Sequence, residues 1–527
     1  MKKTLPLLIT FFVFTFFPHT HAQTPEWSSE IASIVYDHCS SCHHEGGIGP
    51  IALMSYDDAV TNAFSIQSNV TSKKMPPWPA DNDCSYPMSE DRSLNDDEIN
   101  AVNDWVNGGT PSGDLATAPL PPVFNSNSVL DAIDETLHLP LYSVQLAGDE
   151  YRTFVIPSGY NTTNYINQME VIPGNNAIVH HVLVYYDPTS ASYNQDMLDT
   201  LAGFSTNGAN TPSESCIMIG GWAPGAQAEK LPVNMAYAVP ADADFVVEVH
   251  YAPGNAGEFD STKVNFKYST DPNPRLVRVE PVLFHYWPSI NSSLHIPANT
   301  VKTFTEKSLE FMYGGNYSLL SVSPHCHLIG KSWDVYMTSP DNADTTRLLC
   351  IPEWNFDWQL GYEFHNLIQW NSGAGYTLRA EATYDNTTNN PNNPSDPPVD
   401  VSLGESTLDE MMVVFFSFLD YETGDEDIIL GDEATGTDIP MNEALPLSLY
   451  PNPAADQIEI TSILQAGDLK ISILDAAGKL VKSFNEGYQP KGEYASQLSI
   501  ADIPQGIYFL KFVSGNTQTM KKLVKIE

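Results

Sequence analysis

The stretch Phe245-Val246-Val247-Glu248-Val249-His250 decides the fold class of the central part of the chain. Its β-branched and aromatic residues favour extended backbone, and its length is that of an ordinary strand. Similar runs, such as Tyr151-Arg152-Thr153-Phe154-Val155-Ile156, recur between clusters of Gly, Pro, Asn and Asp. Short strands at regular spacing predict two tandem all-β, jelly-roll-like sandwich domains, over residues 130–280 and 281–425.

The rest of the chain divides around this β-rich centre, and its length of 527 residues predicts a multidomain protein. Residues 23–115 have helical spacing of apolar residues and predict a small all-α domain. A Pro-containing linker over 116–129 follows it. An acidic linker over 426–444 leads to a last β-rich module, 445–527, which predicts a small β-sandwich.

The N-terminus is typical of a signal peptide over residues 1–22. Two lysines follow the first Met, residues 5–17 are mostly apolar, and Ala22 is a small residue at the expected cleavage site. No later apolar run is long enough to span a bilayer. We therefore expect an exported protein without a membrane span.

The strongly acidic composition limits the partners of the chain. The formal net charge is −41, and the sequence contains no extended stripe of Lys and Arg residues. Phosphate groups are bound by clustered positive side chains, so we expect nucleic acid and anionic membrane surfaces to be poor partners of this chain.

Cys39-Ser40-Ser41-Cys42-His43 matches the CxxCH pattern of a covalently attached c-type haem. The two thiols add to the vinyl groups of the haem, while the adjacent His reaches the iron. Structural zinc sites also use CxxC, but the sequence has no second CxxC to complete one. We therefore expect one haem c, bound through Cys39, Cys42 and His43.

Met75 is the expected sixth ligand of that iron. It lies in Lys74-Met75-Pro76-Pro77-Trp78, where the prolines would stiffen a loop that presents the thioether. Met54 and Met88 are the alternatives. Downstream, Asn95 and Glu98 form the pattern of a capping box and predict a closing helix. The whole segment resembles class I cytochrome c domains that are fused to other enzymes.

Histidines in the β region follow a pattern that indicates metal binding: His180-His181, His250 and His325-Cys326-His327. Residues two apart in a strand share a face, so His325 and His327 can chelate one ion. The adjacent His180 and His181 point oppositely unless a bulge distorts the strand. Imidazoles with an added thioether favour copper over zinc in a redox setting.

The span from about 130 to 420 resembles the copper type II, ascorbate-dependent monooxygenases, the family of peptidylglycine- and dopamine-hydroxylating enzymes. Five motifs occur in family order: His180-His181, Gly221-Trp222-Ala223-Pro224-Gly225, Val249-His250-Tyr251, His325-Cys326-His327 and Asp409-Glu410-Met411. The resemblance implies two separated coppers. His180, His181 and His250 would hold the electron-transfer copper; His325, His327 and Met411, in the catalytic role, would hold the oxygen-binding copper.

The resemblance implies a secreted copper-dependent monooxygenase that hydroxylates a small organic substrate with O2. Electrons from an external donor, ascorbate-like or a redox protein, would pass through the haem. Ser323 and Phe415 replace an Arg and a Tyr of the peptide-amidating enzymes, which disfavours glycine-extended peptides as substrates. The alternatives are a non-catalytic extracellular electron-transfer or copper-binding protein, and a metal-independent adhesion protein.

Four cysteines lie outside the haem motif: Cys84, Cys216, Cys326 and Cys350. Disulfides are expected for an exported chain, and the sequence leaves the three possible connectivities open. For Cys326, a disulfide, for example to Cys350, is favoured over a copper thiolate. The alternating aromatics Trp354, Phe356 and Trp358 predict a buried strand face.

The C-terminal module opens with Leu449-Tyr450-Pro451-Asn452-Pro453 and ends with a basic strand. It resembles the C-terminal sorting domain of type IX secretion; an ordinary accessory sandwich is the alternative. The resemblance implies that the chain crosses the outer membrane with the type IX machinery as its partner. It would then be secreted or attached to the cell surface.

Overall fold

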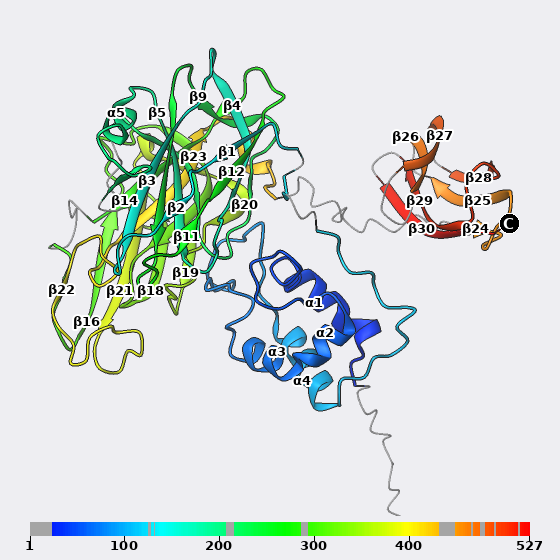
Figure 1. Ribbon diagram of the computed structural model, residues 1–527, viewed down its shortest axis with the longest axis horizontal. Coiled ribbons are helices and arrows are strands. Elements are labelled where there is room, and N and C mark those ends of the chain that lie inside the picture. The colour runs from blue at the N-terminus through cyan, green and yellow to red at the C-terminus, as the bar shows by residue number, and fades with distance from the viewer. Residues whose placement is uncertain are drawn as a thin grey trace, which may run out of the picture. The chain divides into compact units, whose positions relative to one another are not determined.

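The computed structural model describes residues 24–124, 128–130, 132–206, 215–285, 293–431, 448–464, 467–474, 480–489, 492–514 and 517–526. The predicted signal peptide, 1–22, lies outside the described residues. The chain forms two compact units, Met1–Glu433 and Ala434–Glu527 (Figure 1). The architecture is mostly β, with the few helices concentrated near the start of the first unit.

A helical bundle opens the first unit. Its elements are the π-helix η1 (Trp27–Ile31) and the α-helices α1 (Ala32–His38), α2 (Tyr56–Thr61), α3 (Ala63–Thr71) and α4 (Asp96–Asn107). The predicted capping box is confirmed: Asn95 accepts from the Glu98 N–H at 3.0 Å, and the Asn95 N–H donates to the Glu98 carboxylate at 2.9 Å. Trp27, Val102 and Trp105 belong to the bundle's own core.

Residues 76–93, here called the strap, leave this bundle between α3 and α4 and pack on the second sandwich. Ala80 and Met88 belong to the core of that sandwich. The Tyr86 N–H donates to the Leu348 carbonyl, and the Ser89 N–H to that of Glu363. A disulfide joins Cys84 to Cys350. Met88, an alternative iron ligand in the sequence, is therefore a packing residue.

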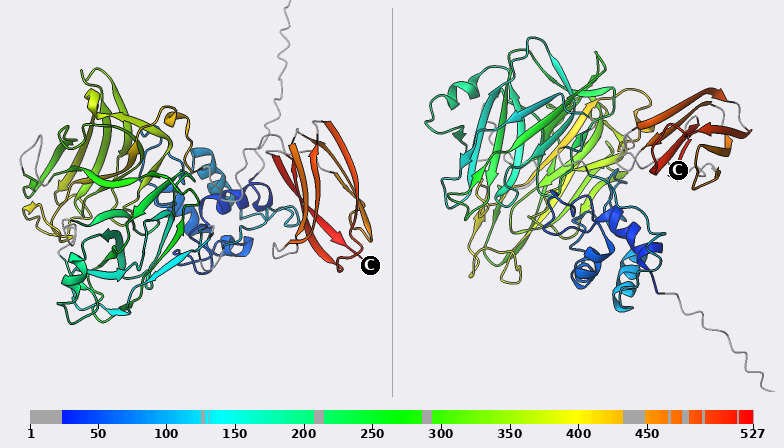
Figure 2. Two further views of the ribbon diagram at one scale, coloured as in Figure 1. Left: turned by 90° about the horizontal axis from the view of Figure 1, so that it is seen from above. Right: turned by 45° about the vertical axis from the view of Figure 1, so that its right-hand side comes forward.

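The first sandwich places two sheets face to face (Figure 2). One contains β1 (Glu135–His138), β12 (Lys263–Tyr268), β4 (Asn164–Ile172), β9 (Met235–Val239) and β13 (Arg275–Leu276), with β8 (Glu229–Lys230) beside β4. The other contains β6 (Phe204–Ser205), β3 (Glu150–Pro157), β10 (Asp244–Tyr251), β5 (Val179–Asp187) and β7 (Ile217–Trp222). β10 is buried at every position, so it shows no alternation of buried and exposed residues.

Smaller elements complete this sandwich: β2 (Tyr142–Ser143) pairs with β11 (Phe259–Asp260), and α5 (Ala191–Asp196) follows β5. The predicted β-rich organisation of residues 130–280 agrees with these sheets.

The second sandwich has two four-stranded sheets. One is β14 (Arg278–Phe284), β23 (Val413–Asp420), β17 (Asn316–His325) and β20 (Tyr362–Asn371). The other is β16 (Thr300–Lys307), β21 (Thr377–Asn386), β18 (Gly330–Thr338) and β19 (Thr345–Ile351). Along β21 burial alternates strictly, as expected for a strand with one face toward a core. β15 (His295–Ile296) pairs with β22 (Val401–Ser402) at the edge.

The two sandwiches pack directly against each other. Leu320, Leu367 and Leu419, from strands of the second sandwich, belong to the core cluster of the first. Arg275 adds two bonds of 2.7 Å to the carboxylate of Asp425, which lies in the 3-10 helix η3 (Asp425–Asp427). Their relative position is therefore fixed by buried apolar contacts and a bidentate ion pair.

The C-terminal unit is a small β-sandwich, as predicted. It contains the sheet β24 (Ser448–Tyr450), β25 (Gln457–Leu464) and β28 (Gly492–Ser499), and the sheet β27 (Leu480–Gln489), β26 (Gly467–Leu474), β29 (Gly506–Ser514) and β30 (Thr517–Lys525). Its core is separate from that of the first unit.

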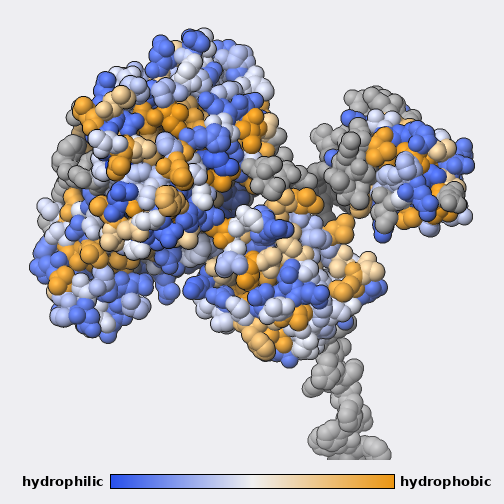
Figure 3. All heavy atoms as spheres, in the orientation of Figure 1, coloured by the Kyte–Doolittle hydropathy of each residue, from blue (hydrophilic) through white to orange (hydrophobic). Residues whose placement is uncertain are grey.

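Hydrophilic and apolar side chains are interspersed on the face of the chain seen in Figure 3. Among the helices of the described residues, none is both long and apolar enough to cross a membrane.

The disulfide corrects one sequence expectation. Cys350 pairs with Cys84, so the suggested Cys326–Cys350 bridge does not form. Cys326 is 1% exposed, and its Sγ accepts from the indole N–H of Trp333. The cysteine directly follows His325, the last residue of β17, and its side chain belongs to the core cluster of the second sandwich.

Replacing Cys84 and Cys350 together with Ala should lower the free energy of unfolding of the first unit by about 2–4 kcal/mol, because a native crosslink is lost. The measurement is urea unfolding followed by tryptophan fluorescence. Cys216→Ala, away from the strap, is the control and should leave the midpoint near that of the wild type. An unchanged midpoint in the double variant would show that the strap is held without the crosslink.

Glu363 gives the strap contact a pH dependence. The Ser89 hydroxyl donates to its carboxylate at 2.7 Å. Burial raises the pKa of Glu363 to about 7. The hydrogen bond from Ser89 lowers this pKa, whereas the nearby carboxylates of Glu90 and Glu229 raise it further. The folded state therefore binds this proton more tightly than the unfolded state, and stability is lost as the pH rises from 4.5 toward 7.

Glu363→Gln keeps an acceptor for Ser89 and removes the ionisation. We expect the variant to be more stable than the wild type at pH 8, by about 1–3 kcal/mol, with the difference disappearing near pH 5. Denaturant unfolding at the two pH values measures it, with the exposed Glu258→Gln as control. A difference independent of pH would contradict this assignment.

Candidate metal centre

His180, His181 and His250 meet where β5 begins and β10 ends. In the antiparallel pairing His250 lies opposite His181, but Tyr251 lies opposite Val179, so His180 is an extra residue in β5. Such a bulge turns neighbouring side chains to the same side. The predicted local distortion is confirmed, and it is the reason that adjacent histidines can serve one site.

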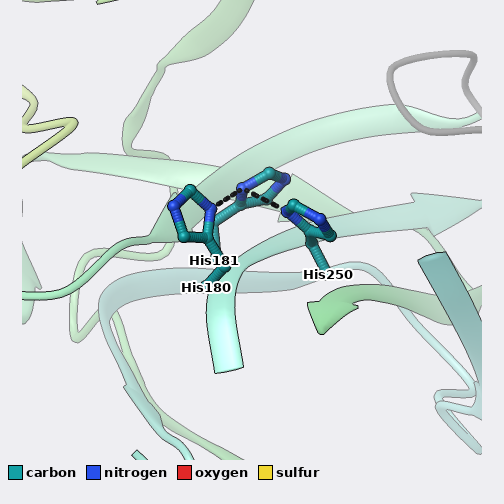
Figure 4. A group of neighbouring side chains, drawn as sticks. All are labelled: His180, His181 and His250. Carbon is teal, nitrogen blue, oxygen red and sulfur yellow. Dashed lines mark hydrogen bonds between the residues drawn. The ribbon is translucent and has the colours of Figure 1, made fainter. Parts of the chain in front are cut away.

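The three rings face one point (Figure 4). One ring nitrogen from each lies within 4.8 Å of the others. The Nδ1 atoms of His180 and His181 are 3.3 Å apart, and those of His250 and His181 are 3.4 Å apart. Nδ1 is therefore the atom that each histidine offers to a metal ion.

Asp149 orients His250. Its carboxylate lies 2.9 Å from Nε2 of His250, so Nε2 carries the proton and Nδ1 keeps its lone pair. Thr407 donates to the other carboxylate oxygen at 2.8 Å. Burial alone would raise the pKa of Asp149, but the hydrogen bonds from His250 and Thr407 lower it below its usual range. Tyr151 stacks on the His250 ring at 4.2 Å.

His325 and His327 form a second set at the end of β17. Their rings are 5.2 Å apart. Nδ1 of His325 is hydrogen-bonded to the side-chain oxygen of Gln359, and Nδ1 of His327 lies 3.1 Å from the Asp409 carbonyl. Both Nδ1 atoms are thus donors, and Nε2 is the atom left for a metal ion.

Burial favours the neutral form of four of these imidazoles, those of His180, His181, His325 and His327, and the neutral form is the one that binds metals. Burial lowers the pKa of His180 and of His325 to about 3, and that of His327 to about 4. The pKa of His181 falls well below its ordinary value for the same reason, with added repulsion from His250.

Glu410 connects Met411 to the second set. Its buried carboxylate accepts from the N–H groups of His327 at 2.8 Å, Ile329 at 2.9 Å and Met411 at 3.2 Å. The backbones of His327 and Met411 therefore meet at one carboxylate oxygen. Met411 is 4% exposed, and its carbonyl accepts from Tyr384 at 2.6 Å.

The two histidine sets lie side by side. His181 and His325 come from different sandwiches, yet their ring centres are 6.3 Å apart. Phe356 stacks on His180 at 4.6 Å and meets His327 edge-on at 5.9 Å. Each set comes from its own sandwich, as expected, and the two sets are close neighbours in space.

Phe356 also corrects the expected buried strand face. Residues 352–361 contain no strand, and Trp354 alone of the three aromatics is buried in the core of the second sandwich. Phe356 is half-buried and contacts the candidate metal ligands instead. The alternation of aromatic residues was misleading because the segment is an irregular loop with turns.

The predicted haem ligands lie in the helical bundle. Cys39 and Cys42 are not bonded to each other, and burial raises the pKa of the Cys39 thiol to about 12. Nδ1 of His43 is 3.0 Å from the Ile51 carbonyl, which leaves Nε2 for an iron atom. A Cβ at Gly49 would come within 2.5 Å of this Nδ1, so the loop closely cradles the ring. Met75 is half-buried where the strap begins.

Asp149, Thr407 and Gln359 are supporting residues that sequence reasoning missed. One signal for Asp149 was available in the sequence. When the runs 151–156 and 245–250 pair as antiparallel strands, Tyr151 lies opposite His250, and Asp149 then lies close to the His250 ring. Thr407 and Gln359 lie in loops, and no strand or helix pattern gives their position.

Residues 448–527 match the family model of the secretion system C-terminal sorting domain. The C-terminal unit is a type IX secretion sorting domain. The chain is therefore exported through the outer membrane and is secreted or attached to the cell surface. Its partner in that step is the secretion machinery, as the sorting domain implies.

No curated protein matches the chain. Among solved structures, PNGase F, a glycosylasparaginase from Flavobacterium meningosepticum, is 12% identical, with 55% of this chain and 96% of that one covered and a TM-score of 0.24. A β-glucuronidase from Bifidobacterium dentium is 12% identical, covering 43% of this chain and 39% of its own, at a TM-score of 0.14. The chain spans less than half of the length of that enzyme.

If the three-histidine set binds copper, as the sequence predicts, Asp149→Ala should weaken that binding about 10–100-fold, because His250 loses the partner that fixes its tautomer. Titration against a chromophoric copper chelator measures the affinity. The exposed Asp400→Ala is a control of the same charge change. Equal affinities in both variants would remove Asp149 from the site.

Proposed function

We propose that the chain is an exported copper-dependent monooxygenase that hydroxylates a small organic substrate with O2 and receives electrons through a fused c-type haem. The observation that carries the proposal is the convergence of three imidazole Nδ1 atoms next to a second histidine pair. The resemblance to copper type II monooxygenases supplies the reaction class.

The donor set fits copper. Five imidazoles and the thioether of Met411 match the ligand preference of copper in a redox role. Zinc sites of the structural class are closed by four ligands, usually with thiolates, whereas the Cys326 thiol lies in the core and accepts from the indole N–H of Trp333. The haem motif also fits its group. Nδ1 of His43 is hydrogen-bonded to the Ile51 carbonyl, which leaves Nε2 for the iron, and Cys39 and Cys42 form no disulfide with each other.

Copper at these residues would supply one electron per ion for the reduction of O2, and the haem would relay electrons from an external donor, ascorbate-like or a redox protein. The protein's own part is to orient the imidazole rings. Asp149, Gln359 and the Asp409 carbonyl hold the imidazole protons at the outer nitrogens. Tyr151 stacks on the ring of His250, and Phe356 stacks on that of His180.

Substrate recognition differs from that of the peptide-amidating enzymes. Ser323 of β17 and Phe415 of β23 are direct cross-strand partners. The family has an Arg and a Tyr at these two positions, so both replacements fall on neighbouring residues of the same sheet. A hydroxyl and an apolar ring offer no charge to a carboxylate, so we expect a substrate without a terminal carboxylate at this position.

Oxygen uptake by the copper- and haem-loaded chain, across a panel of organic substrates, tests the proposal. Met411→Ala should lower substrate-dependent uptake at least about 100-fold while the haem is still reduced, because a ligand in the reacting site is lost. Met337→Ala, a buried methionine in the core of the same sandwich, is the matched control.

Two results would contradict the monooxygenase. Wild-type turnover in Met411→Ala would remove Met411 from the site. Copper binding and haem reduction without substrate-dependent uptake would favour the non-catalytic electron-transfer or copper-binding alternative.

A further inference from the structure

We infer that the five histidines form one bimetallic centre, in which two ions share a small bridging ligand and couple magnetically. This differs from the two independent, separated coppers that the resemblance implies. The inference rests on the proposed function only for the identity of the metal.

The first support is the distance between the two sets. The ring centres of His181 and His325 are 6.3 Å apart, with the rings at 79°. A metal ion lies about 2.0–2.1 Å from an imidazole nitrogen, so the space between these two ring centres is small enough for the ions bound by the two sets to be neighbours. Two-metal sites in enzymes have ions roughly 3.5–4 Å apart, which a single small ligand bridges.

The second support is the fixed position of the sandwiches. The strand that carries His325 also carries Leu320, which is 1% exposed and packed in the core cluster of the first sandwich. Moving His325 away from His181 would expose Leu320 and break the Arg275–Asp425 ion pair. The short distance between the His181 and His325 rings therefore follows from the packing of the two sandwiches and not from side-chain rotation alone.

The third support is a shared set of supporting residues. Thr407 holds Asp149, which holds His250 in the first set. Two and three residues later, the Asp409 carbonyl and the Glu410 carboxylate hold His327 in the second set. One short segment of the second sandwich thus orients ligands of both sets, and Phe356 contacts both as well.

Two dications at this distance repel each other, and the repulsion must be offset. The acidic side chain of Asp149, whose carboxylate lies 2.9 Å from Nε2 of His250, places an anionic group beside the centre. An anionic bridge supplies another. Azide, a three-atom anion, is therefore a suitable probe of the space between the ions.

The test uses the full haem-loaded chain with two equivalents of Cu(II). Metal analysis gives copper per chain, and electron paramagnetic resonance gives cupric spins per chain, with the haem signal integrated separately. We expect the spin count to be at most half of the copper count, with a half-field transition that changes on addition of azide. Two full spins for two coppers, with no half-field transition and no azide effect, would overturn the inference.

His325→Ala with His327→Ala is the decisive variant. It should keep one copper on the three-histidine set and show one full spin, without a half-field transition and with an integrated intensity that azide leaves unchanged. The exposed His295→Ala is the matched control and should behave as the wild type. A reduced spin count that persists in the double variant would place the coupling elsewhere and overturn the inference.

The failures of the two proposals are distinguishable. A chain that takes up two coppers and consumes O2 with substrate, but shows two independent spins, contradicts the bimetallic centre alone. A chain that couples its coppers without substrate-dependent uptake contradicts the monooxygenase alone. A chain that takes up one copper or none contradicts the bimetallic centre through the metal count itself.

Discussion

The packing of one β-sandwich against the other is the constraint on which the candidate site depends, because neither sandwich contains all of its histidines. Leu320, Leu367 and Leu419 enter the core cluster of the first sandwich, and Arg275 binds Asp425 across the same boundary. These contacts bring His325 to His181 and Thr407 to Asp149. The fold therefore supplies the site's geometry before any metal ion is bound.

A second long-range contact ties the helical bundle to this arrangement. The strap begins directly after Met75, enters the core of the second sandwich through Met88 and is fixed by the Cys84–Cys350 disulfide. The segment expected to present the sixth iron ligand is thus attached to the sandwich that carries His325 and His327. If the bundle holds the proposed haem, that haem would not have to find the candidate site by diffusion.

Local patterns in the sequence predicted those parts of the structure that depend on local physics. The strand runs at 151–156 and 245–250, the capping box at Asn95 and the bulge at His180-His181 all follow from spacing and backbone preferences. The strap, the disulfide partner of Cys350 and the supporting roles of Asp149 and Phe356 depend on contacts between distant segments. Periodicity contains no information on such contacts, and the alternating aromatics at 354–358 suggested a strand where the chain forms a loop.

Metal analysis of the purified exported chain tests the central claim most directly, since every step of the proposed chemistry requires the histidine sets to hold copper. The account predicts one iron and two coppers per chain, with the copper content lost when His181 and His325 are replaced together with Ala. A chain that carries zinc in place of copper, or that retains its copper in this variant, would contradict it.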